Sequence, residues 1–110
     1  MRRVYYASGS FLTSTVIASA IVDYAHALAR TNGSDIVEFP IALEGGHIGA
    51  ASVLIGPASQ IASASEFSEL EEPTDAFLLK ELERKTQLVG VPRPVVQTDG
   101  TEFSLDDEFE

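Results

Sequence analysis

The chain has 110 residues, and its 45% apolar and 22% charged residues are typical of one soluble globular domain, not of a collagen-like or low-complexity chain. It contains no cysteine, which excludes disulfide scaffolds, zinc–thiolate sites and cysteine nucleophiles. The net charge of −10 repels phosphate backbones, so we expect no nucleic-acid partner. Most acidic residues lie in two runs, at 66–75 and 102–110, which is typical of hydrated connectors and tails.

The amino end begins with two arginines and continues into an apolar stretch, as secretory signals do. Residues 4–10 separate the arginines from this stretch, and Asp23 and His26 interrupt it, so we favour a folded segment. The same interruptions exclude a transmembrane helix, which needs about 20 mostly apolar residues. We therefore expect a cytoplasmic protein with no membrane partner.

The first predicted elements are a strand and a helix. The β-forming run Val4-Tyr5-Tyr6 predicts a strand over Arg3–Ser8, which Ser8-Gly9-Ser10 ends. Thr13 or Ser14 then caps a helix that runs to Arg30 and closes at Asn32-Gly33. Helical spacing places four of its apolar side chains in one stripe: Ile17, Ile21, Tyr24 and Leu28.

Three further strands are predicted next. Alternating apolar residues indicate strands over 35–43 and 48–56, joined by a turn at 44–47 whose adjacent glycines accept positive φ. Pro40 lacks an amide hydrogen, so the first of these strands is either an edge or locally irregular. A weaker strand is predicted over 59–65.

The carboxyl-terminal part begins with a second helix. Thr74 is the expected cap, with Asp75 near the positive end of the helix dipole, and Gly90 ends the helix. Two prolines favour an extended form over 91–96, and the acidic remainder is expected to be disordered in isolation. We thus predict one domain over 1–90 and an extended, acidic tail over 91–110.

The order β-α-β-β-(β)-α predicts an α+β fold, a two-layer sandwich with a mixed three- to four-stranded sheet and both helices on one face. The first helix connects strands one and two as parallel neighbours. Both faces of the 48–56 strand are apolar, so we expect an uncovered sheet face that exposes Tyr5, Ile36, Ile48 or Leu54. A second copy of the sheet or another protein would cover it.

One sequence feature suggests a ligand site. Ser8-Gly9-Ser10 precedes the predicted helix, whose free amides and dipole favour an anion. Thr13 and Ser14 add hydroxyl groups to this candidate anion-binding or ligand-binding loop. It contains one glycine and no lysine, so neither glycine-rich phosphate motif is present, and a plain strand-to-helix turn is the competing interpretation.

The other candidates have plain structural interpretations. Asp23, His26 and Arg30 form a polar row on the outer side of the first helix, where we expect a solvated surface and no catalysis. His47 sits at the predicted hairpin tip, without metal-ligand spacing, so we predict no metal and no cofactor. Phe103 and Phe109 are aromatic anchors in the acidic tail that suit a basic or apolar partner, or else belong to a solubilising tail.

These observations favour a small, non-enzymatic interaction or assembly module that associates with itself, as a homodimer or larger, or with another protein. The candidate interface residues are Phe39, Val53, Leu54 and Ile55, for which the sequence does not assign faces. The alternative is a domain, possibly an enzyme, that binds a small molecule or anion at Ser8-Gly9-Ser10. A third hypothesis, an acidic mimic of nucleic acid, is opposed by the location of the charge in the connector and tail.

Overall fold

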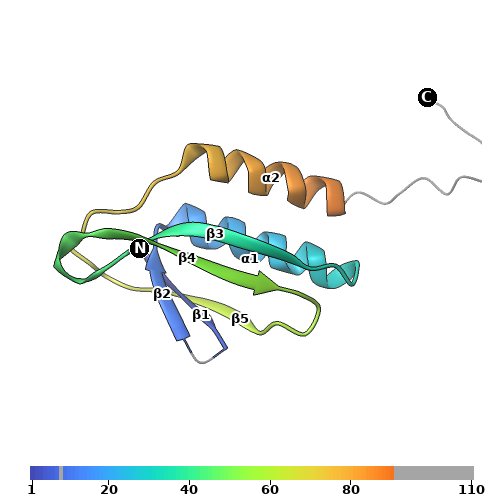
Figure 1. The fold of residues 1–110 in the computed structure, drawn as a ribbon, viewed down its shortest axis with the longest axis horizontal. Helices are drawn as coiled ribbons and strands as arrows, with labels where there is room; N and C mark the ends of the chain where they lie inside the picture. The colour runs from blue at the N-terminus through green and yellow to red at the C-terminus, as the bar shows by residue number, and fades with distance from the viewer. Residues whose placement is uncertain (8, 91–110) are drawn as a thin grey trace, which may run out of the picture.

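A computed structural model describes residues 1–7 and 9–90 and shows an α+β fold with a five-stranded sheet (Figure 1). The elements are β1 (Arg2–Tyr6), β2 (Gly9–Thr13), α1 (Thr15–Arg30), β3 (Asp35–Ala42), the 3-10 turn η1 (Glu44–Gly46), β4 (Ile48–Ile55), β5 (Ile61–Ser65) and α2 (Ala76–Gly90). The predicted α+β class and both helices are confirmed. The predicted tail, with Phe103 and Phe109, lies outside the described residues.

Strand β2 was not predicted from the sequence. Gly9–Thr13 pairs antiparallel with β1, from Tyr6 opposite Gly9 to Arg2 opposite Thr13. A two-residue hairpin loop of this kind requires positive φ, and Ala7 adopts a φ of 53° although it is not glycine. The interpretation of this segment as a loop leading into the helix is therefore wrong.

The sheet order is β4-β3-β2-β1-β5, and every neighbouring pair is antiparallel. The predicted mixed sheet, with its first two strands parallel and adjacent, is wrong because β2 lies between β1 and β3. Helix α1 instead connects two antiparallel neighbours, β2 and β3. The packing of both helices on one face as a two-layer sandwich stays a prediction.

Strands β2 and β3 meet at one end only. Their register is a single pair, Leu12 opposite Ala42, and the Thr13 hydroxyl donates to the Pro40 carbonyl at 2.9 Å. Beyond this junction the β1–β2 hairpin runs across the direction of β3 and β4 (Figure 1). Its Phe11 ring meets Phe39 of β3 edge-on, with the ring centroids 6.0 Å apart. The sheet therefore consists of the β3–β4 hairpin and the three-stranded unit β2-β1-β5, which diverge from a short shared junction.

The core forms where α1 packs against the inner face of β3 and β4. The predicted stripe on α1 is confirmed, since all four of its side chains are buried: Ile17, Ile21, Tyr24 and Leu28. The opposing sheet residues alternate in sequence, as half-buried strands require: Val37, Phe39 and Ile41 on β3, and Ala51, Val53 and Ile55 on β4. Leu82 of α2 completes this cluster.

The helices begin and end close to the predicted residues. Ser14 caps α1 by accepting the amide hydrogen of Ile17, and Asn32 follows the helix with a φ of 60°. Asp75 caps α2, because its Oδ1 accepts the amide hydrogen of Leu78 at 3.0 Å; the expectation that Thr74 is the cap is wrong. The two helices lie side by side (Figure 1).

Candidate functional site

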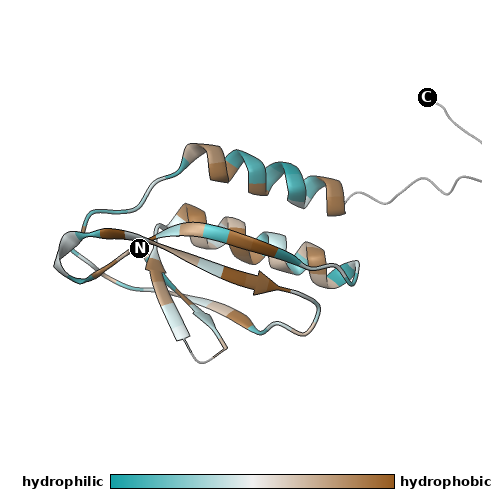
Figure 2. Cartoon of the chain, viewed as in Figure 1, coloured by the Kyte–Doolittle hydropathy of each residue, from teal (hydrophilic) through white to brown (hydrophobic). Residues whose placement is uncertain are grey.

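The side of β3 and β4 that faces away from the core exposes several large apolar side chains. Both strands contain strongly hydrophobic stretches, drawn in brown in Figure 2. Ile36 is 66% exposed, and Leu54, directly opposite it in register, is 58% exposed. Ile48 is 47% exposed at the other end of β4. We call this surface the outer face and define it by the even-numbered residues of the two strands: Ile36, Glu38, Pro40 and Ala42, and Ile48, Ala50, Ser52 and Leu54.

The outer face confirms part of the sequence interpretation and corrects another part. Tyr5, Ile36, Ile48 and Leu54 were expected on an uncovered surface, and all four are exposed. Of the four candidate interface residues, Leu54 alone lies on the outer face. Phe39, Val53 and Ile55 are at most 4% exposed because their side chains point into the core beside α1. They are core residues, and their assignment to an interface is wrong.

The backbone of β4 is open along its outer edge. In the register of β3 and β4, odd-numbered residues lie opposite odd-numbered residues. The next odd pair in this register is Leu43 and His47, and the Leu43 amide donates to the His47 carbonyl at 2.8 Å, so the odd pairs are the directly hydrogen-bonded ones. In an antiparallel ladder, directly bonded pairs alternate with pairs whose backbone groups point away. The even residues of β4 therefore direct their amides and carbonyls to the free edge. Consistently, the Leu54 carbonyl is reached from outside the ladder, by the Tyr6 hydroxyl.

No hydrogen bond among residues 1–7 and 9–90 reaches the outward backbone groups of Ile48, Ala50 and Ser52. The same alternation directs the even residues of β3 toward its other side. There Pro40 has no amide to leave unpaired, and its carbonyl accepts the Thr13 hydroxyl. Strand β2 pairs with β3 only at Ala42, so at Pro40 this side of β3 is a free edge. The expectation that Pro40 marks an edge position is therefore met.

The opposite edge of the sheet, along β5, is protected. The Glu66 amide donates to the Met1 carbonyl at 3.0 Å. By the alternation of an antiparallel ladder, the backbone groups of the even residues of β5 therefore point toward β1, and those of the odd residues point outward. The Arg2 guanidinium covers this outward side: it donates to the Ser63 carbonyl at 3.1 Å and to the hydroxyls of Ser63 and Ser65. A charged group at a sheet edge discourages pairing with another strand. Strand β4 has no charged residue of any kind.

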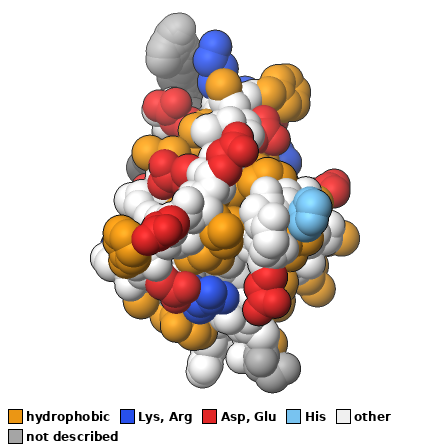
Figure 3. Space-filling model, turned by 90° about the vertical axis from the view of Figure 1, so that its left-hand side faces the viewer, with side chains coloured by type: hydrophobic (Ala, Val, Ile, Leu, Met, Phe, Trp, Pro, Cys, Tyr) orange, Lys and Arg blue, Asp and Glu red, His pale blue; other side chains and the backbone are white. Residues whose placement is uncertain are grey.

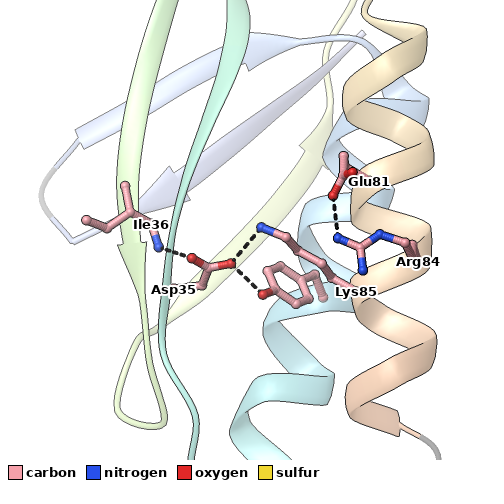
Figure 4. Close-up of polar contacts among 6 residues, drawn as sticks. Asp35, Ile36, Glu81, Arg84 and Lys85 are labelled. Atoms are coloured by element: carbon pink, nitrogen blue, oxygen red, sulfur yellow. Dashed lines mark hydrogen bonds and ion pairs between the residues drawn. The ribbon is translucent and has the colours of Figure 1, made fainter.

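A polar cluster connects β3 to both helices (Figure 4). Asp35 accepts hydrogen bonds from the Tyr24 hydroxyl at 2.5 Å and from Lys85 at 3.2 Å, both on Oδ2, and its Oδ1 accepts the Ile36 amide at 2.7 Å. The hydrogen bond from Tyr24 lowers the pKa of Asp35, against the opposing effect of burial. Burial, and then the hydrogen bond to Asp35, raise the pKa of Tyr24. Since both shifts fix the resting protonation states, the cluster is suited to holding elements together and not to proton transfer.

The predicted ligand loop is not assembled. Gly9 and Ser10 belong to β2, away from the start of α1, and Ser8 lies outside the described residues. The Ser10 hydroxyl accepts a hydrogen bond from Arg3 at 3.2 Å. Thr13 and Ser14 are buried, and their hydroxyls are used by the Pro40 carbonyl and the Ile17 amide. The premise of a strand-to-helix anion site is therefore wrong.

The remaining polar candidates lie where the sequence predicts. Asp23, His26 and Arg30 are exposed on α1, and His47 is exposed after η1. Among residues 1–7 and 9–90, no group of three histidine, aspartate or glutamate side chains is placed to hold a metal ion. Acidic side chains are dispersed over the end of the molecule seen in Figure 3 and do not form one cluster.

Comparisons with known proteins add no family: no family model matches the sequence, and no curated protein or solved structure is significantly similar to it. Neither of the two described helices has the length and apolarity that crossing a bilayer requires. The outer face and the free edge of β4 are thus the features of the described residues on which a functional interpretation rests.

Proposed function

We propose that this chain is a small, non-enzymatic assembly module, acting in the cytoplasm, that self-associates through the β3–β4 hairpin and the apolar side chains of its outer face. The observation that carries the proposal is the exposure of Ile36 and Leu54, which lie opposite each other in register. Contiguous apolar side chains at a protein surface usually mark a contact with another molecule, whereas single exposed apolar residues do not.

The distribution of charge supports a second copy as the partner. The chain has a net charge of −10, which opposes the approach of two copies over most of their surfaces. The outer face contains one charged side chain, Glu38, among its eight residues. Of the acidic side chains in the described residues, Glu38 alone lies on this face, so two copies that meet at the β3–β4 hairpin bring few of these charges together.

The first test of self-association is a charge placed on the outer face. We expect Leu54→Glu to weaken the association constant about a hundredfold or more, because an unpaired buried carboxylate costs about 3 kcal/mol. The measurement is the concentration dependence of mass in analytical ultracentrifugation. Ala29→Glu, at an exposed position on α1, is the matched control and should leave the mass unchanged. A native chain that stays monomeric at every concentration contradicts the proposal.

Salt provides an independent expectation. Raising the ionic strength from about 0.01 M to about 0.15 M shortens the screening length from about 30 Å to about 8 Å, so repulsion between two acidic copies falls. An apolar contact is not weakened by this change. We expect tighter self-association at the higher salt concentration, measured by the same sedimentation experiment. Dissociation by salt would instead indicate an interface held by ion pairs.

A further inference from the structure

We infer that two copies join by pairing β4 with β4 of the second copy, antiparallel, across a two-fold axis at Ala51. The two five-stranded sheets would then form one continuous sheet. This inference rests on the proposed self-association and places the contact at the β4 edge, where the outer faces of the two copies lie on the same side and join into one apolar surface at Ile48 and Leu54.

The state of the two sheet edges carries the inference. Strand β4 has eight residues, no charge and no proline, and its pairing with β3 is regular along its whole length, without a bulge. Long, flat, apolar edge strands are templates for another strand, and proteins usually blunt them with charges, prolines or bulges. The β5 edge is blunted by Arg2, whereas β4 carries none of these features.

The outward backbone groups select the possible registers. Only the even-numbered residues of β4 direct their backbone amides and carbonyls to the free edge. In a hydrogen-bonded pair across the junction, an even-numbered residue must therefore lie opposite an even-numbered residue of the second copy. With Ala51 on the axis, Ala50 lies opposite Ser52 of the second copy, and Ile48 lies opposite Leu54 of the second copy. Each of these residues then exchanges backbone hydrogen bonds with its counterpart. The Leu54 carbonyl also accepts hydrogen bonds from the Tyr6 hydroxyl and, at 3.4 Å, from the Ser59 hydroxyl, so the longer Ser59 contact must give way when the second copy pairs there.

The side chains on the outer face decide between registers. With Ala51 on the axis, Ile36 and Leu54 of one copy and Ile48 of the second copy are neighbours on three adjacent strands and form one apolar row. The two-fold axis generates a second, identical row at the other end of the junction. If Ala50 lay on the axis, Leu54 would lie opposite Gly46 in the turn of the second copy, and Ile48 opposite Ser52. The first register alone places Leu54 of each copy opposite Ile48 of the other, so the two large apolar side chains meet at both ends of the pairing.

Cysteine cross-linking tests this register directly, since the native chain contains no cysteine. Residues on the axis of an antiparallel pair that is not directly hydrogen-bonded have Cα atoms about 4.5 Å apart, within the range that a disulfide spans. We expect Ala51→Cys to form a covalent dimer under mild oxidation at least about tenfold faster than Ala50→Cys. In this register the Cα atoms of residue 50 in the two copies lie farther apart than the roughly 7 Å that a disulfide can span. Random collision predicts the reverse order, because Ala50 is exposed and Ala51 is buried.

A proline variant keeps the test decisive if a cysteine perturbs the fold. Ser52→Pro removes an amide that points to the free edge and leaves the hydrogen bonds to β3 intact. We expect a folded chain, as judged by circular dichroism, with at least about a tenfold loss of self-association, equivalent to 1.4 kcal/mol.

The outcomes separate the two proposals. Faster cross-linking at position 51 together with dissociation by Ser52→Pro supports the strand pairing. A native dimer that cross-links faster at position 50, or that Ser52→Pro leaves intact, overturns the pairing while the assembly function stands. A native chain that is monomeric by ultracentrifugation at every concentration overturns both.

Discussion

Replacing Phe39 by alanine is expected to lower the free energy of unfolding by about 3–5 kcal/mol, a large part of the 5–15 kcal/mol typical of a small domain. Phe39 is 1% exposed and lies where three parts of the fold meet: the inner face of β3 and β4, helix α1, and the Phe11 ring of the crossing hairpin. The cavity left by the ring cannot close without moving one of these parts. Urea titration followed by circular dichroism measures the loss.

Phe77→Ala is the matched control, since it removes the same ring from a side chain that is 76% exposed on α2. Surface substitutions of this kind usually change stability by no more than about 0.5 kcal/mol. Equal losses for the two variants would contradict the placement of Phe39 in the core. The comparison also distinguishes a core residue from an interface residue, because an interface residue exposed in the monomer would tolerate alanine as Phe77 does.

Elements with strong periodicity were predictable from the sequence. The stripe on α1 repeats with helical spacing, and the alternation from Val37 to Ile41 is that of a half-buried strand, so both were found with nearly correct bounds. The glycines of the turn were also informative, since Gly45 and Gly46 adopt φ values of 81° and 82°. Local preferences and tertiary burial agree in these segments.

Strand β2 was missed because its sequence gives two conflicting signals. Ser8-Gly9-Ser10 is typical of a turn, and the strand that follows has only five residues. Its turn contains Ala7 at positive φ, where a sequence interpretation expects glycine. The single pair between Leu12 and Ala42 depends on the tertiary crossing of the two hairpins, which no local pattern encodes.

The faces of β4 follow from the sequence once the register of its hairpin with β3 is fixed. Phe39 clearly belongs to the buried face of its strand, and a hairpin that turns at Gly45-Gly46 places Ala51 opposite Phe39. Position 51, and with it 53 and 55, must then face the core, which leaves Leu54 outside. The open edge of β4 was less accessible, because it depends on the sheet order and on the position of β5 at the opposite edge.

The Asp35 cluster is the second place where we expect a large effect. Asp35→Asn weakens the hydrogen bonds from the Tyr24 hydroxyl and from Lys85, which connect β3 to α1 and α2 (Figure 4). Hydrogen bonds to a charged group contribute about 1.5–3 kcal/mol, and the 29% exposure of the Asp35 side chain moves the expected loss to the lower end, about 1–2 kcal/mol at neutral pH.

This loss should depend on pH in one direction. The pKa of Asp35 is lower in the folded chain than in the unfolded chain, chiefly because of the hydrogen bond from Tyr24. Its contribution is therefore present above the unfolded pKa and disappears as the pH falls through the folded pKa. We expect the native chain and Asp35→Asn to differ most at neutral pH and to converge below about pH 4, in urea titrations at a series of pH values.

Two further variants identify the cause. Glu81→Gln removes another carboxylate whose pKa is lowered, here by the hydrogen bond from Arg84 within one helix, and because solvent screens that surface pair the substitution should change stability little. Tyr24→Phe removes the hydroxyl that Asp35 accepts. If Tyr24 acts through Asp35, the double variant Tyr24→Phe with Asp35→Asn should cost less than the two single losses added together. Strict additivity, or a loss from Asp35→Asn that persists unchanged at acid pH, would mean that the carboxylate does not hold α1 and α2 to β3.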